Sequence, residues 1–270
     1  MGELNGKVAI VTGAGRLRGI GRAAAVELAR LGADVVVTGT GRNPDTFPPD
    51  EKAVGWRDID SVADQILEHG VRALPLVADV TNPLDVQNMV DSAIREFGRV
   101  DILINNAAFA RGVDRVPILD LDQNMFQRVL DIKVTGTFLC TKAVLKHLVD
   151  QGDGGKIVNI SSTAGKRGSA NTLAYNAANF AIVGMTQSMA QELGPHGINV
   201  NAVCPGAVDT HRMDLLGRGE RWERMAANTP IRRNGTDEET GAFCVYLCTD
   251  AASWIHGQSI NINGGTLMEH

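Results

Sequence analysis

Three polar side chains stand close together in the sequence, beside one short apolar run: Ser162, Tyr175 and Asn179. Ser162 follows residues 156–160, a β-branched segment introduced by glycines that predicts a buried strand. Tyr175 and Asn179 are four residues apart, so in a helix they share one face. Apolar residues at helical spacing predict that helix as far as Leu193. The sequence thus predicts a hydroxyl, a phenol and an amide near the carboxyl end of a strand, where open α/β sheets bind ligands.

A glycine-rich turn near the amino terminus predicts a second functional region. Residues 7–12 form a predicted strand, residues 13–21 contain four glycines, and a helix is predicted from about Arg22 to Leu31. Glycines in such a turn let backbone approach a pyrophosphate, and the following helix supplies free N–H groups and a favourable dipole. The order of strand, turn and helix therefore indicates a dinucleotide-binding opening.

This combination of motifs resembles the short-chain dehydrogenase/reductase family. The family has a catalytic Ser thirteen residues before a Tyr, and Ser162 and Tyr175 match that spacing. At position 179 the family has Lys and this chain has Asn, whereas Lys133 stands where the family has Asn. The same exchange occurs in ketoreductase domains of polyketide synthases and animal fatty-acid synthase, whose K-V-x-G and Y-x-x-x-N runs resemble residues 133–136 and 175–179.

The resemblance implies hydride transfer between a nicotinamide dinucleotide and a ketone or secondary alcohol. It makes Tyr175 the proton donor in reduction, Ser162 the group that orients the carbonyl, Lys133 the cation that favours a phenolate, and Asn179 a contact to ribose or part of a proton path. A free tyrosine has a pKa of about 10. An ammonium about 4 Å away favours the phenolate by roughly 4 kcal/mol at an effective dielectric of about 20. The phenol needs a nearby charge, whichever segment supplies it.

Two alternatives to this ketoreductase interpretation remain, and the exchanged Lys favours the first of them. One is a catalytically silent nucleotide-binding sensor or scaffold of the same fold. The other is an NAD-dependent catabolic dehydrogenase.

The resemblance also implies which residues bind the dinucleotide. They belong to the glycine-rich turn and to segments after four predicted strands: Gly13, Gly15, Arg18, Gly19, Ile20, Gly21, Arg42, Asp79, Val80, Asn106, Ala107, Pro205, Gly206, Val208 and Thr210. NAD enzymes of the family have an acid at the end of the second strand, where this chain has Gly39. Because Arg18 and Arg42 could meet a 2′-phosphate, the sequence favours NADP(H), with NAD(H) as the alternative.

The whole chain, residues 1–270, is predicted to form one doubly wound Rossmann domain with about seven parallel strands and helices on both faces. The glycine-rich turn is two residues longer than the family pattern, and residues 16–18 are expected to bulge outward. Residues 43–57 form an inserted loop, predicted either to cover the adenosine or to contact a neighbouring subunit. Residues 211–230 occupy the position of the family's substrate lid.

Composition excludes several other functions. A net charge of −5 gives no basic surface for nucleic acid. No apolar run is long enough to span a membrane and no signal peptide is recognisable, so a cytoplasmic location is expected. The four cysteines are scattered and predict buried thiols rather than a metal site. The family resemblance implies a small-molecule carbonyl or alcohol as substrate and a homotetramer as the assembly.

Overall fold

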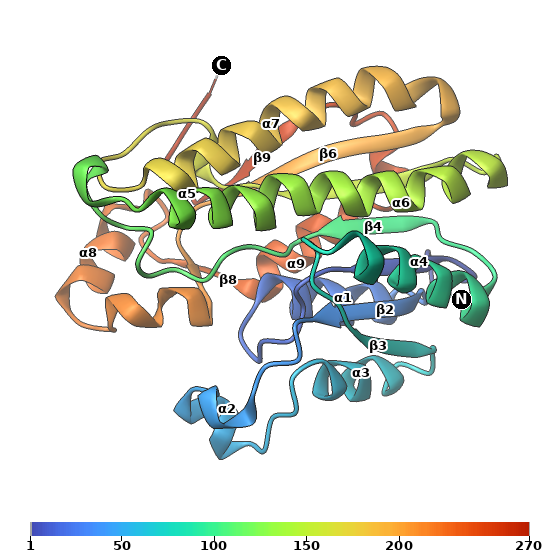
Figure 1. Ribbon diagram of the computed structural model, residues 1–270, viewed down its shortest axis with the longest axis horizontal. Coiled ribbons are helices and arrows are strands. Elements are labelled where there is room, and N and C mark those ends of the chain that lie inside the picture. The colour runs from blue at the N-terminus through green and yellow to red at the C-terminus, as the bar shows by residue number, and fades with distance from the viewer. Residues whose placement is uncertain (1, 270) are drawn as a thin grey trace.

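A seven-stranded parallel sheet forms the centre of the computed structural model, which describes residues 2–269 (Figure 1). The strands lie in the order β3-β2-β1-β4-β5-β6-β9. Their bounds are β1 Val8–Val11, β2 Asp34–Gly39, β3 Ala73–Val77, β4 Ile102–Asn105, β5 Gly155–Ile160, β6 Ile198–Pro205 and β9 Ser259–Ile262. The central strands β1 and β4 are buried along their whole length, as expected of β-branched segments covered on both faces.

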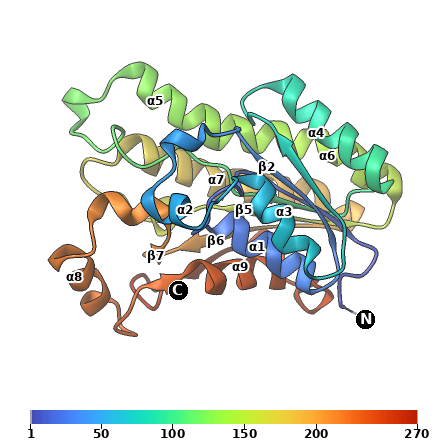
Figure 2. The same cartoon turned by 90° about the horizontal axis from the view of Figure 1, so that it is seen from below.

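Helices cover both faces of the sheet, giving the three layers seen in Figure 2. One apolar core joins the sheet to α1 Ile20–Arg30, α3 Ile59–Leu67 and α9 Asp237–Tyr246. The other joins it to α4 Pro83–Phe97, α6 Gly136–Gln151 and the end of α7 Leu173–Leu193. The predicted doubly wound fold with seven parallel strands is therefore confirmed.

The strand order reverses direction at β1. The chain passes from β1 outward to β2 and β3, then returns to β4 on the other side of β1. Crossovers on either side of this point leave a crevice at the carboxyl ends of the strands, which is where ligands bind in open α/β sheets. The glycine-rich turn follows β1 directly at this edge.

Acidic residues near the start of residues 122–149 and basic residues near the end predict one long helix, but in the structure this helix is interrupted. It consists of α5 Gln123–Leu130, a π-helical turn Asp131–Thr135, and α6. The π turn carries Lys133. Such turns insert a residue into an α-helix and recur at functional sites, so this local geometry sets the direction of the Lys133 side chain.

The inserted segment and the lid both contain helices. Residues 43–57 fold into a 3₁₀ turn, Pro44–Thr46, and the short helix α2, Pro49–Ala53, each with a proline in its first turn. The lid contains a 3₁₀ helix, His211–Leu216, and α8, Glu220–Asn228. A small parallel ladder between β7 Val208–Asp209 and β8 Gly235–Thr236 joins the two ends of the lid. No helix within residues 2–269 is long and apolar enough to cross a membrane.

Candidate active site

A cleft of about 670 Å³ opens at the carboxyl ends of β1, β2, β3 and β4. Most residues predicted to bind the dinucleotide line it: Gly13, Gly15, Arg18, Gly19, Ile20, Gly21, Arg42, Asp79, Val80, Asn106, Ala107 and Thr210. Pro205, Gly206 and Val208 are not among the lining residues; they lie at the end of β6 and in β7. The structure thus brings together residues from five separate segments that the sequence assigned to one ligand.

The glycine-rich turn approaches the end of β4 closely. Gly13 has a φ of +65°, and a Cβ built on it would lie 2.8 Å from the Cα of Ala107. A Cβ on Gly21 would lie 2.4 Å from the amide nitrogen of Asn106, which donates hydrogen bonds to the Thr12 and Gly13 carbonyls at 2.9 and 2.8 Å. Glycine is therefore required sterically at both positions. The first N–H groups of α1 follow directly, so the turn fits the phosphates of a dinucleotide.

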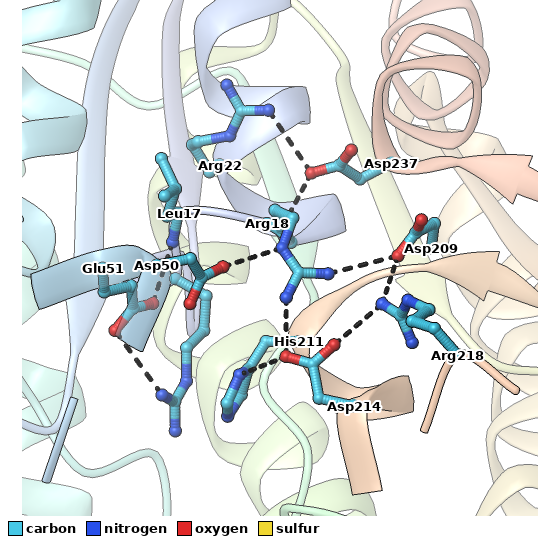
Figure 3. A network of polar contacts seen from close by, with 12 residues as sticks. Leu17, Arg18, Arg22, Asp50, Glu51, Asp209, His211, Asp214, Arg218 and Asp237 are labelled. Carbon is cyan, nitrogen blue, oxygen red and sulfur yellow. Dashed lines mark hydrogen bonds and ion pairs between the residues drawn. The ribbon is translucent and has the colours of Figure 1, made fainter. Parts of the chain in front are cut away.

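Arg18 is held by three carboxylates (Figure 3). Its guanidinium donates to Asp50 at 2.9 Å, to Asp209 at 3.1 Å and to Asp214 at 2.6 Å. Burial opposes the charge, but the hydrogen bonds to Asp214 and Asp50 outweigh it and raise the pKa of Arg18. The arginine predicted to meet a 2′-phosphate therefore already ties the glycine-rich turn to α2 and the lid.

Arg42 is also fully engaged. It donates to Glu51 at 2.7 Å, to Asp58 at 3.0 Å and to the Gly15 carbonyl at 2.8 Å, and its guanidinium lies 4.4 Å from the centre of the Phe47 ring. The sequence alone suggested that Arg42 is a cation free to bind a 2′-phosphate. In the structure its charge is opposed by two carboxylates.

Asp58 is a site residue that sequence reasoning missed. A Cβ on Gly15 would lie 1.9 Å from its Oδ1, and a Cβ on Gly39 would lie 3.6 Å from its Oδ2. The carboxylate thus lies beside the end of β2, where the sequence offered only Gly39. Asp58 has a φ of 56° and its side chain does not cap α3, although it occupies the cap position. A non-glycine residue in this conformation is strained, and such strain clusters at functional sites.

Residues 16–18 do not bulge outward, contrary to expectation; they are half-buried against the inserted segment. Leu17 N–H donates to Glu51 at 3.1 Å, and Glu51 is 1% exposed. The Trp56 indole N–H donates to the Gly15 carbonyl at 2.7 Å. The extended glycine-rich turn and residues 43–57 therefore pack against each other. Residues 43–57 thus support the glycine-rich turn.

The serine and tyrosine come from neighbouring elements. Ser162 follows β5, and its Oγ accepts a hydrogen bond from the Ala164 N–H at 3.1 Å. Tyr175 lies in the first turn of α7 and is half-buried. Asn176, the next residue, donates to the Ala164 carbonyl at 2.6 Å and so fixes the turn after Ser162 against the helix. The Ser–Tyr pair is thus positioned by direct contact between its two supporting segments.

Asn179 is buried within α7. Its side-chain amide donates to the backbone carbonyl of Tyr175, one turn earlier, at 2.8 Å. Its backbone carbonyl accepts from the Ser161 hydroxyl at 3.0 Å. The predicted contact to ribose would use this same amide. In the structure the amide nitrogen stabilises the first turn of the catalytic helix.

Lys133 is buried, with an exposed fraction of 4%. Its Nζ donates to the Ala107 carbonyl at 3.4 Å, and Ala107 lines the cleft. Burial, reinforced by the charge of Arg212, lowers the pKa of Lys133 to about 7. The amine is therefore close to half-protonated at neutral pH.

Two arginines lie directly over the Tyr175 ring. The guanidinium carbon of Arg115 is 3.9 Å from the ring centre, and that of Arg212 is 4.9 Å away. Arg115 belongs to the segment between β4 and α5, and Arg212 belongs to the lid. Sequence reasoning identified neither arginine as a site residue. The signal available was the presence of four arginines in residues 211–230.

Other parts of the described chain offer no comparable chemistry. A cavity of about 590 Å³ lies at the amino ends of β4, β5 and β6, opposite the cleft. No group of three metal-ligating side chains occurs within residues 2–269. All four cysteines are buried free thiols, and burial raises the pKa of Cys140 and of Cys248 to about 12.

Comparison with known proteins gives matches over nearly the whole chain. A family model described as enoyl-(acyl carrier protein) reductase matches residues 13–266. A 3-oxoacyl-(acyl-carrier-protein) reductase of Synechocystis sp. is 36% identical over 99% of this chain and 100% of its own. The solved structure of a double mutant of the Serratia marcescens short-chain dehydrogenase/reductase is 33% identical, with a TM-score of 0.84 and coverage of 98% and 99%. A solved 7α-hydroxysteroid dehydrogenase, complexed with NADH and 7-oxo glycochenodeoxycholic acid, is 32% identical, with a TM-score of 0.85 and coverage of 98% and 96%.

Proposed function

The chain belongs to the short-chain dehydrogenase/reductase family and is an oxidoreductase acting on CH–OH groups, and we propose that it interconverts a ketone and a secondary alcohol with Tyr175 as the acid–base group. The observation that carries this proposal is the contact between the two segments bearing Ser162 and Tyr175, made by Asn176 and the Ala164 carbonyl at 2.6 Å. It fixes a hydroxyl and a phenol at the sheet edge that also holds the cleft lined by the residues predicted to bind the dinucleotide.

The proposed mechanism assigns a separate task to each residue. The Ser162 hydroxyl donates to the substrate carbonyl oxygen and polarises it. Tyr175 gives its phenolic proton to that oxygen during reduction and takes it back during oxidation. The nicotinamide dinucleotide, when bound in the cleft, supplies or accepts the hydride. The glycine-rich turn and the amino end of α1 hold its phosphates.

We further propose that Lys133 has taken over the role of the family lysine, with Asn179 in its place on the helix. A lysine whose pKa is about 7 can exchange protons readily at neutral pH, as general acids and bases do. Asn179 then supports the catalytic helix through its bond to the Tyr175 carbonyl.

Replacing the tyrosine tests the acid–base assignment. Tyr175→Phe is expected to lower kcat at least about a hundredfold, the usual contribution of general acid–base catalysis, with little change in nucleotide affinity. The measurement is NADH and NADPH oxidation against a ketone panel. Tyr246→Phe, the only other tyrosine change available, is the matched control and should retain wild-type rates.

The same assay tests the exchange of Lys and Asn. Lys133→Ala should lower activity steeply, and Lys133→Asn combined with Asn179→Lys should restore it. Full activity in Tyr175→Phe would refute the mechanism. A wild type that binds nucleotide without turnover, together with an active double variant, would favour the silent sensor.

For the cofactor we propose NAD(H), in place of the NADP(H) that the sequence alone favours. The Asp58 carboxylate beside Gly39 can accept hydrogen bonds from ribose hydroxyls and repels a 2′-phosphate. Arg18 and Arg42, the cations that would bind that phosphate, are both paired with carboxylates. The solved 7α-hydroxysteroid dehydrogenase with NADH is a related protein that uses this nucleotide.

Removing the Asp58 charge tests this preference. Asp58→Asn is expected to lower the ratio of kcat/KM for NADH to kcat/KM for NADPH by about tenfold or more, equivalent to roughly 1.4 kcal/mol of discrimination. Asp60→Asn, an exposed carboxylate in the first turn of α3, is the control and should leave the ratio unchanged. A wild-type preference for NADPH would contradict the proposal.

A further inference from the structure

A group of arginines surrounds Tyr175 without matching acids. Arg115 and Arg212 both lie within 5 Å of the ring centre, at 3.9 and 4.9 Å. Arg111 is close enough to both that their charges, after burial, lower its pKa. Only Asp114 opposes them, through an ion pair with Arg115 at 3.0 Å. The side of the site where substrate must approach Tyr175 is therefore strongly positive.

This arrangement differs from the rest of the molecule. Arg18 contacts three carboxylates, Arg42 two and Arg99 two, and the whole chain carries a net charge of −5. Within residues 2–269, neither Arg111 nor Arg212 has a carboxylate within ion-pair distance. The other arginines of the described chain without a carboxylate partner, Arg95, Arg167, Arg221 and Arg232, are exposed to solvent, whereas Arg111 and Arg212 are half-buried beside the reactive phenol. Their repulsion costs stability, so an anion bound among them would be held strongly.

The positions of the arginines are fixed by the surrounding backbone. The Asp114 carboxylate accepts from the Gly112 N–H at 3.1 Å while pairing with Arg115, which makes the segment a compact loop. Arg212 donates to the Phe109 carbonyl, linking the lid to the same loop. Figure 1 shows α8 of the lid at the same end of the molecule as the start of α7. The guanidiniums are thus preorganised for one small ligand between loop and lid.

We propose that Arg111, Arg115 and Arg212 bind a carboxylate of the substrate, and that the substrate class is a short oxo acid and its hydroxy acid. The inference rests on the proposed function. A guanidinium presents paired donors that match a carboxylate. Because the arginines lie on the face of the Tyr175 ring, the carboxylate lies one or two carbons from the reacting carbonyl.

The reaction then leaves the carboxylate unchanged. In reduction the carbonyl carbon gains a hydride, which brings two electrons, and the carbonyl oxygen gains the Tyr175 proton. The C–O π bond breaks, and one C–H and one O–H bond form. The oxidised nucleotide and the hydroxy acid are the products, so charge and atoms balance.

Matched substrates test the inference. NADH oxidation is measured with acetoacetate and with methyl acetoacetate, in which a methyl group on the carboxylate oxygen removes the charge. The wild type should prefer the acid by about tenfold or more in kcat/KM, since charge-assisted hydrogen bonds are worth more than one such factor. Arg111→Gln and Arg212→Gln should each lower this preference about tenfold, mainly through KM for the acid. Arg224→Gln, on the exposed face of α8 and paired only with Glu220, is the control and should keep the preference.

A binding measurement separates failure of the inference from failure of the proposed function. Calorimetry of the NAD⁺-loaded protein with malonate and with malonamide should show binding of the anion alone. Malonate binding without turnover of any carbonyl would keep the carboxylate site and refute the proposed function. Turnover of the ester as efficient as that of the acid, or no malonate binding, would overturn the inference. Arginine variants that weaken nucleotide binding, with the acid preference intact, would assign the guanidiniums to the cofactor and also overturn it.

Discussion

Burial changes what Lys133 can do at neutral pH. The sequence identified it by its place in a motif that resembles the family's. The structure adds that its amine is 4% exposed with a carbonyl as its hydrogen-bond acceptor. Desolvation of an ammonium favours the neutral amine, which explains a pKa of about 7. Lys133 is thus suited to passing protons as well as to supplying charge.

This pKa predicts how Lys133 affects stability. Between pH 7 and 10.5 the unfolded chain binds a proton at this lysine that the folded chain has lost, so stability rises with pH across this range. The destabilisation is therefore complete below pH 7 and vanishes above 10.5. Lys133→Met should be more stable than the wild type at pH 6, on the order of 2–5 kcal/mol.

The measurement is urea unfolding of both proteins from pH 6 to 10, where the difference between them should shrink steadily. Taking the difference cancels groups that titrate alike in both proteins. A Met variant less stable than the wild type at pH 6 would contradict the lowered pKa.

Residues that lie far apart in sequence but close together in the fold could not be predicted as parts of one site. Ser162 and Tyr175 were found because they lie in one short stretch with a fixed spacing. Arg115 and Arg212 come from other segments and reach Tyr175 only through tertiary folding. Asp58 was missed for the same reason, since it comes well after Gly39 along the chain but lies beside it in space.

At the scale of elements, the inserted segment and the extended glycine-rich turn form one unit. Glu51 in α2 joins them, because it accepts from the Leu17 N–H at 3.1 Å and from Arg42 at 2.7 Å while being 1% exposed. A buried carboxylate with these partners holds the turn in place. Glu51 therefore links a feature of the fold to the shape of the nucleotide cleft.

Removing that carboxylate should destabilise the protein. Glu51→Ala leaves a buried N–H unsatisfied and Arg42 with one carboxylate fewer, which predicts a loss of about 2–4 kcal/mol in the free energy of unfolding. Nucleotide KM should rise as well, because the turn loses its support. Denaturant unfolding and NADH kinetics provide the two measurements. Lys52→Ala, the exposed neighbour, should change stability by no more than about 0.5 kcal/mol. If Glu51→Ala changed the free energy of unfolding by an equally small amount, the inserted segment and the glycine-rich turn would not depend on each other.

Regular elements followed the local pattern closely. Periodicity and end signals are local, and they predict a strand at 72–78 and a helix at 59–69. The structure has the strand at Ala73–Val77 and the helix at Ile59–Leu67. The π turn at Asp131–Thr135 has no such local signal, and the helix was predicted as continuous. The contact between residues 43–57 and the glycine-rich turn could not be predicted from segments so distant in sequence.

At the scale of the whole molecule, the outer surface of α6 and α7 carries large apolar side chains. Phe138 on α6 is 50% exposed and Phe180 on α7 is 45% exposed. Both helices cover the same face of the sheet (Figure 1). Exposed aromatic residues on adjoining helices are typical of surfaces buried between subunits. The homotetramer implied by the family would use this surface, and it stays a prediction.

Charge placed on this surface should therefore weaken assembly. The wild type is expected to have a solution mass about four times the 28.8 kDa of the chain, measured by light scattering after size exclusion. Phe138→Glu combined with Phe180→Glu should shift the mass towards dimer or monomer, because burying two carboxylates costs several kcal/mol per interface. Leu67→Glu replaces a residue of similar exposure on α3, across the sheet, and should leave the mass unchanged. A tetramer that persists in the double variant would place the interface elsewhere.

Loss of assembly should also lower kcat, because Lys133 lies on the π turn and Tyr175 on α7, beneath this surface. The activity of the site would then depend on the assembled state.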